Sequence, residues 1–152
     1  MKRLVSYLFI SLLFFFLGSV YGFRSGMENY YHLNKLPTAL IDSGFYKKIG
    51  VGDTETYKAW INDNVDLAFD SYQWYEAHGS RFFSNILLND YVDSRESYLI
   101  RLIDFRKAVP ASKNISSMLS EESRVFYLDS VKKRNSFLLS RGVPESQLTK
   151  LN

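Results

Sequence analysis

Three aspartates stand at helical spacing in the middle of the chain, at positions Asp63, Asp66 and Asp70. Residues three and four apart are neighbours on one edge of an α-helix, where like charges cost about 0.2–0.5 kcal/mol per pair. Trp60 and Trp74 border this row. Tryptophan is a frequent anchor of protein interfaces. We therefore name these five residues the acidic strip and predict that they bind a basic protein partner.

The same charges have two simpler explanations. A run of charge on a helix is usually a solvated face. Residues 53–76 carry six acids and one lysine, whereas residues 121–141 carry five basic residues against three acids. These two segments could therefore pair with each other across the surface of the protein. Both explanations stay open beside partner binding.

The residue types give less support for a metal, cofactor or catalytic site. His32 and His78 are the two histidines, and His78 precedes Gly79 at an expected helix end, where the helix dipole stabilises a protonated imidazole. With no cysteine and no second group of ligands, we predict no metal and no cofactor. No serine lies in a nucleophile-elbow motif, so no catalytic residue is assigned. Acid or base catalysis on a cell-wall polymer, by Glu76 or an aspartate of the acidic strip, is the alternative function.

An uncharged apolar run occupies residues 4–23, directly after Lys2 and Arg3. A basic head, an apolar centre and small residues near Gly22 are the layout of a signal peptide over residues 1–22, cut before Phe23. The alternative is an uncleaved membrane anchor, since about 20 apolar residues suffice to span a bilayer. In both cases the basic head stays inside, so the body is expected on the non-cytoplasmic side.

The remaining residues, 23–152, are expected to form one domain with its own hydrophobic core. The formal charge of +3 falls to +1 without Lys2 and Arg3, so the basic balance gives no reason to expect nucleic acid as a partner. An exported domain without cysteine is typical of the bacterial envelope rather than of disulfide-stapled extracellular modules. We expect a periplasmic or secreted protein, or a membrane-anchored one if the apolar helix is retained.

The periodicity of apolar residues predicts an all-α bundle of four or five helices behind the N-terminal apolar helix. The strongest helix runs from Asp53 to Gly79 and turns the aspartates of the acidic strip to its solvent face. A helix or kinked continuation begins at Asp93 and is apolar nearly all round, which predicts a central position. The other expected helices cover residues 25–33, 38–43, 80–92 and 120–141, with a final turn or two after Pro144.

These observations predict an exported, non-catalytic helical protein that binds another envelope or secreted protein. An inhibitor or immunity factor, a chaperone and an assembly subunit are the types that fit a small helical domain without a recognisable catalytic set. Two alternatives are kept: the carboxylate enzyme described above, and an accessory subunit of a membrane complex that retains the apolar helix as its anchor.

Overall fold

The computed structural model describes residues 2–46, 54–79, 89–113 and 115–151. These residues form helices and short 3-10 turns, with no strand in the described part of the chain, so the predicted all-α class is confirmed. The elements are α1 (Lys2–Leu33), α2 (Lys35–Tyr46), α3 (Thr54–His78), α5 (Asn89–Ala108), η1 (Ser116–Met118), α6 (Glu121–Ser140) and η2 (Glu145–Gln147).

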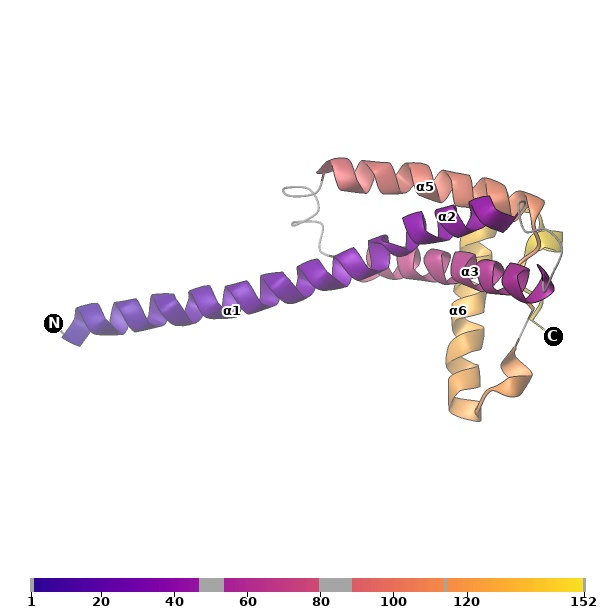
Figure 1. Cartoon of the computed structure of the whole chain (residues 1–152). Helices are drawn as coiled ribbons and strands as arrows, with labels where there is room; N and C mark the ends of the chain where they lie inside the picture. Colours follow the sequence, from indigo (N-terminus) through magenta and orange to yellow (C-terminus); the bar gives the residue numbers. More distant parts are fainter. Residues whose placement is uncertain (1, 47–53, 80–88, 114, 152) are drawn as a thin grey trace.

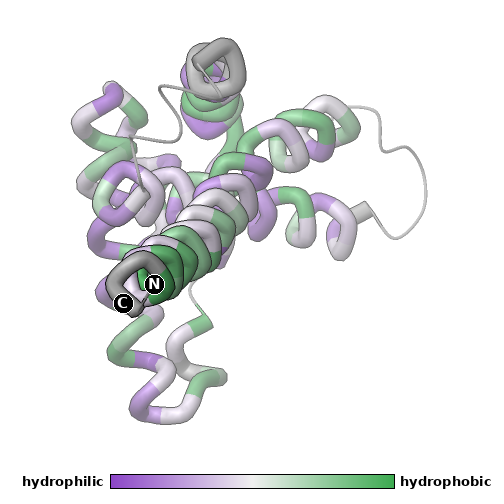
Figure 2. The backbone as a smooth tube through the Cα atoms, turned by 90° about the vertical axis from the view of Figure 1, so that its left-hand side faces the viewer, coloured by the Kyte–Doolittle hydropathy of each residue, from purple (hydrophilic) through white to green (hydrophobic). Residues whose placement is uncertain are grey.

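Helix α1 projects far beyond the bundle, as Figure 1 shows. The large apolar side chains from Val5 to Phe23 are 47–76% exposed. By length and composition this helix can cross a membrane. At about 1.5 Å per residue, residues 5–23 extend about 28 Å, close to the roughly 30 Å of a bilayer core. Figure 2 looks along this helix and shows the apolar colouring of its outer part. The described apolar helix fits both an export signal and an anchor.

The junction of α1 and α2 differs from the expected one. Only Asn34 separates the two helices, and α2 already begins at Lys35, before Pro37. Proline is tolerated in the first turn of a helix because the N–H groups there have no partner within the helix. Gly44 lies inside α2 instead of ending it. Pro37 therefore allows a new helix to start where an interruption was expected.

Helix α3 agrees with its prediction within a residue at each end. Gly79 follows it, and its N–H donates to the carbonyl of Tyr75 at 2.7 Å. A Cβ at Gly79 would lie 2.5 Å from that carbonyl oxygen and from the Tyr75 ring, so a larger residue does not fit. On the expected core face, five residues are buried: Ile61, Val65, Ala68, Tyr72 and Tyr75.

Helix α5 begins at Asn89, before the expected start at Asp93, so no new helix begins at Asp93. The helix predicted over residues 80–92 lies mostly outside the described residues. Leu99 and Leu102 are buried, but Ile100 is 57% exposed, so α5 is not surrounded by protein on all sides. The prediction of a fully central helix is therefore wrong, because part of its circumference faces solvent.

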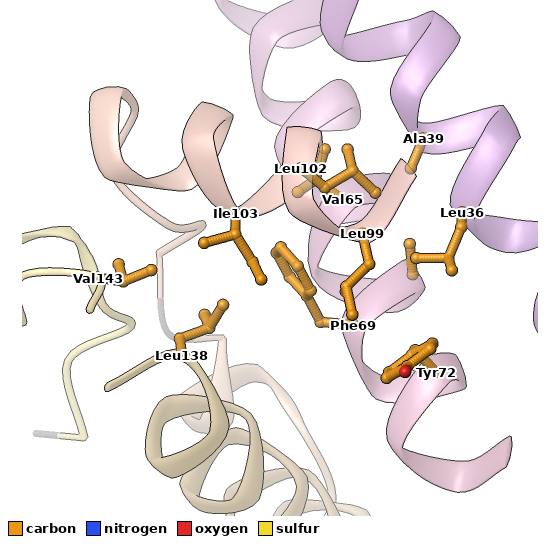
Figure 3. Packing of buried hydrophobic residues seen from close by; sticks show 11 residues of the cluster. Leu36, Ala39, Val65, Phe69, Tyr72, Leu99, Leu102, Ile103, Leu138 and Val143 are labelled. Carbon is orange, nitrogen blue, oxygen red and sulfur yellow. The ribbon is translucent and has the colours of Figure 1, made fainter. Parts of the chain in front are cut away.

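Helix α6 has the predicted ends. The Ser120 side chain accepts a hydrogen bond from the Ser123 N–H, which is an N-cap, and Gly142 follows the helix with φ of +77°. In Figure 1, α6 runs across the direction of the other helices, and its first half extends away from them. Its second half closes the core: Leu138 and the following Val143 pack with Phe69 of α3 and Ile103 of α5 (Figure 3).

Candidate functional site

The acidic strip is divided by the fold. Asp63 is exposed, whereas Asp66 is only 4% exposed and Asp70 is half-buried. The prediction that all three aspartates share a solvent face is therefore wrong for Asp66. The physical reason is the arrival of two arginines from other helices, which cover this side of α3.

Asp66 is held in a buried ion-pair network. Its Oδ1 accepts from Nη2 of Arg106 at 2.7 Å, and its Oδ2 lies 3.7 Å from Nη2 of Arg134. The backbone N–H of Ser112 also donates to Oδ2, at 3.3 Å. Removing one member of such a pair leaves an uncompensated buried charge, so the network holds α3, α5 and α6 in register.

Arg106 is fully buried, and its Nη1 and Nη2 groups donate to polar groups around it, whereas its Nε meets no hydrogen-bond acceptor within the described residues. Nη1 donates to Oδ1 of Asn62 at 3.2 Å and to the carbonyls of Val109 and Pro110 at 3.2 and 2.6 Å. The two carbonyls belong to the residues just after α5, which ends at Ala108. Arg106 thus connects the chain that leaves α5 to α3. Burial lowers its pKa, and the charge of Asp66 opposes that shift.

Asp70 forms the second half of the network, on the side of α6. Its Oδ2 accepts from Nη1 of Arg134 at 2.6 Å and from the hydroxyl of Ser130 at 3.0 Å. Burial raises the pKa of Asp70, and the guanidinium of Arg134 opposes that shift. Pairing between the acidic helix and the basic segment, one of the simpler explanations for the acidic strip, is therefore confirmed, although the pairs are largely buried instead of lying on the surface.

A cleft between α3 and α6 opens beside Asp70. Its volume is ≈ 330 Å³, and its lining residues are Asp70, Gln73, Trp74, Ala77, His78, Phe126, Asp129, Ser130 and Lys133. Phe126 is 80% exposed, an unusual state for a phenyl ring. On the α6 side of the cleft, Lys133 forms an ion pair with Asp129, one turn earlier on the same helix, at 2.7 Å. We name these lining residues the α3–α6 cleft.

Both histidines stack on the indole of Trp74. The ring centroids lie 3.9 Å apart for His32, at the end of α1, and 5.1 Å apart for His78, at the end of α3. His32 also meets the ring of Tyr31 edge-on at 5.2 Å. Burial lowers the pKa of His32, and Glu28 opposes this shift. The stack attaches the end of α1 to the end of α3.

Trp60 is separated from this group along the helix. It is 53% exposed and lies 14 positions before Trp74, about 21 Å along the helix axis. Asp63 lines a different groove, of ≈ 580 Å³, next to Tyr46 and the residues that follow α5. The structure therefore brings Asp66, Asp70 and Trp74 to the α6 side of α3 but does not join Trp60 and Asp63 to them. Their role in partner binding stays a prediction.

The residues that sequence reasoning missed are the arginines. Arg106 stands next to Lys107 in a segment that was predicted to be apolar nearly all round, and periodicity does not show which of its cations is buried against a counter-charge. Arg134 was counted among the basic residues of its helix but was not singled out.

The cleft lacks a developed catalytic arrangement in its described residues. Asp70 has the raised pKa of an acid or base, but Oδ2 is occupied by Arg134 and Ser130. Oδ1 is buried and meets no hydrogen-bond donor within the described residues, so it is not presented to a substrate. The described residues also contain no group of three or more histidine or acidic side chains placed to hold a metal ion.

Comparison with protein-family models, with curated protein sequences and with solved structures finds no match to this chain.

Proposed function

We propose that this chain is a membrane-anchored, non-catalytic protein whose bundle binds a protein partner through the α3–α6 cleft, on the non-cytoplasmic side. The observation that carries the proposal is the exposure of Phe126 at the cleft. Met118 and Val125, in the same projecting part of the chain, are exposed by 84% and 64%. Exposed apolar groups gathered beside a polar rim are typical of interaction surfaces.

The energetics favour a protein as the occupant. Burying a phenylalanine side chain that is left in water contributes about 1.5–3 kcal/mol. Interfaces gain most of their affinity from a few aromatic anchors in well-packed pockets, surrounded by polar groups that exclude water. Phe126 and Trp74 supply aromatic surface, and Asp129 and Lys133 supply a charged rim. Because the side chain of Asp129 is 58% exposed and that of Asp70 only 24%, a basic partner group would reach Asp129 more readily than the buried aspartates.

The continuity of α1 supports the anchor over the signal peptide. The helix passes without a break through the expected cut site at Gly22 and continues to Leu33, which is fully packed in the bundle. A peptidase needs the chain around its cut in an accessible, extended form, and this stretch is helical. An anchor of this kind also keeps the cleft close to the membrane, where an accessory protein would meet a membrane-bound partner.

The test is site-specific photo-crosslinking in the cell of origin. A photoreactive residue at position 126 should give one dominant crosslinked protein, and Phe126→Ser in the full chain should reduce the amount of partner purified with it at least tenfold. Ile41→Ser is the matched control, since Ile41 is 63% exposed on α2. Equal partner recovery for Phe126→Ser and Ile41→Ser would refute the cleft as the binding site.

Trp60→Ser belongs in the same experiment. Trp60 is exposed but lies outside the cleft lining, so the cleft predicts normal recovery for this variant. Loss of the partner with Trp60→Ser, and not with Phe126→Ser, would instead return the interface to the exposed edge of α3 that the sequence suggested.

A further inference from the structure

Helix α1 fixes the distance between the membrane and the bundle. The apolar span ends at Phe23, and the first buried residues of α1 are Asn29 and Leu33, at 3% and 1% exposure. Six residues of helix separate Phe23 from Asn29, which is about 9 Å. The headgroup layer on each side of a bilayer is about 5–8 Å thick. If α1 spans the membrane, the first packed residues of α1 therefore lie at the outer edge of the headgroups, and the start of α5 extends further toward the projecting part of α1 than the end of α3 does (Figure 1).

The end of α3 faces the same way. Helix α3 runs back along α1, so that its C-terminus points toward the projecting part of α1 (Figure 1). Trp74 stacks on His32, nine residues beyond Phe23 and about 13 Å above the apolar span. His78 lies one turn further along α3, which brings it to about 8 Å from that span. The end of α3 is therefore the part of this helix nearest to the lipid.

The side chains at this end are those that membrane interfaces select. Tyr30 and Tyr31 are 51% and 58% exposed, and Trp74 and His78 stand beside them. Tyrosine and tryptophan combine an apolar ring with a polar tip, and both are enriched at the level of the headgroups. Lys35 lies over the ring of Tyr31 at 4.8 Å and adds a cation to the same surface.

We infer that the end of the bundle formed by Tyr30, Tyr31, Trp74 and His78 faces the lipid headgroups of the bilayer that α1 spans, with His78, about 8 Å from the apolar span, at their outer edge. This inference rests on the proposed anchor and adds a second, peripheral contact with the same membrane. The contact restricts the swing of the bundle about α1 and so fixes the direction in which the α3–α6 cleft opens.

The two tryptophans allow a direct test in the full-length protein. Trp60→Phe leaves Trp74 as the only indole, and Trp74→Phe leaves Trp60, about 21 Å further along α3. Both variants are reconstituted in phosphatidylcholine vesicles in which a fraction of the headgroups carries a nitroxide quencher. The expected result is at least twofold quenching of Trp74 and no more than a few per cent quenching of Trp60.

Equal quenching of the two tryptophans, or none of either, would overturn the inference. A carbonate wash of the same vesicles separates this outcome from failure of the anchor. A chain that leaves the vesicles on washing contradicts the proposed function itself. A chain that stays while Trp74 is not quenched contradicts only the headgroup contact. Circular dichroism of both variants shows whether each retains the helical content of the unmodified chain.

Discussion

Replacing Asp66 with asparagine tests the buried ion-pair network, because the change removes one charge and almost no volume. Arg106 is fully buried and Arg134 is 5% exposed, so both guanidinium groups would lose their shared counter-ion away from solvent. Asp70 would then be the one anion of the network, opposite the two cations Arg106 and Arg134. Breaking a buried pair in this way costs about 3–5 kcal/mol. The hydrogen bonds from Arg106 to Asn62 and to backbone carbonyls would survive, which favours the lower part of that range.

The assay is urea unfolding of the full chain in detergent, and the unfolded fraction is monitored by tryptophan fluorescence and circular dichroism. With a slope of about 1–3 kcal/mol per molar urea, a loss of about 3 kcal/mol moves the midpoint down by roughly 1–3 M. Asp63→Asn is the matched control: it makes the same chemical change three residues earlier, at an exposed position. Surface substitutions of this kind stay within about 0.5 kcal/mol.

A double variant shows whether the cost arises from the pair. Asp66→Leu combined with Arg106→Met removes both charges, and apolar replacement of a buried pair is often neutral or stabilising. We expect the double variant to lose less stability than the sum of the two single variants, by about 1–3 kcal/mol. The reasoning is refuted if Asp66→Asn unfolds at the same urea concentration as Asp63→Asn, or if the two single losses simply add.

Three further predictions concern the stack on Trp74, two glycines and the N-cap of α6. Because burial lowers the pKa of His32 from 6.5, the folded state binds fewer protons than the unfolded chain. The contribution of His32 to stability should therefore be full above pH 6.5 and decrease as the pH falls below it. His32→Gln should weaken this pH dependence, measured in urea titrations at about pH 5.5 and 7.5. Gly142→Ala should cost about 1–2 kcal/mol because its φ is +77°, whereas Gly44→Ala, inside α2 with open space around it, should stabilise by about 0.5–1 kcal/mol in thermal melts. Ser120→Ala should cost about 1 kcal/mol through loss of the N-cap, and Ser120→Asp should restore it.

Local signals explain why the helix boundaries were predictable from the sequence. Ser120, Gly79 and Gly142 act through the backbone of their own segment, so their roles need no knowledge of the rest of the fold. The buried face of α3 follows from periodicity in the same way. The gap predicted between residues 33 and 38 is wrong because Pro37 can either break a helix or lie in the first turn of a new one, and only the neighbouring helices decide between the two.

The candidate site was only partly predictable, because its chemistry depends on long-range pairing. A helical projection assigns Asp66 to the polar side of α3 from its residue type alone. Its burial requires Arg106 and Arg134, which are 40 and 68 positions further along the chain and enter from two other helices. Trp60 and Trp74 share a flank of α3, yet only Trp74 meets the end of α1. The periodicity of α3 alone cannot predict which of the two tryptophans contacts α1.

The central functional claim is that α1 stays attached and anchors the bundle to a membrane. Mass spectrometry of the protein purified from its own cells tests this claim most directly. Membranes washed with carbonate should yield a polypeptide that still contains residues 4–22 joined to Phe23. A mature protein that begins at Phe23 and is recovered without detergent from the soluble fraction would contradict the anchor and, with it, the contact with lipid headgroups.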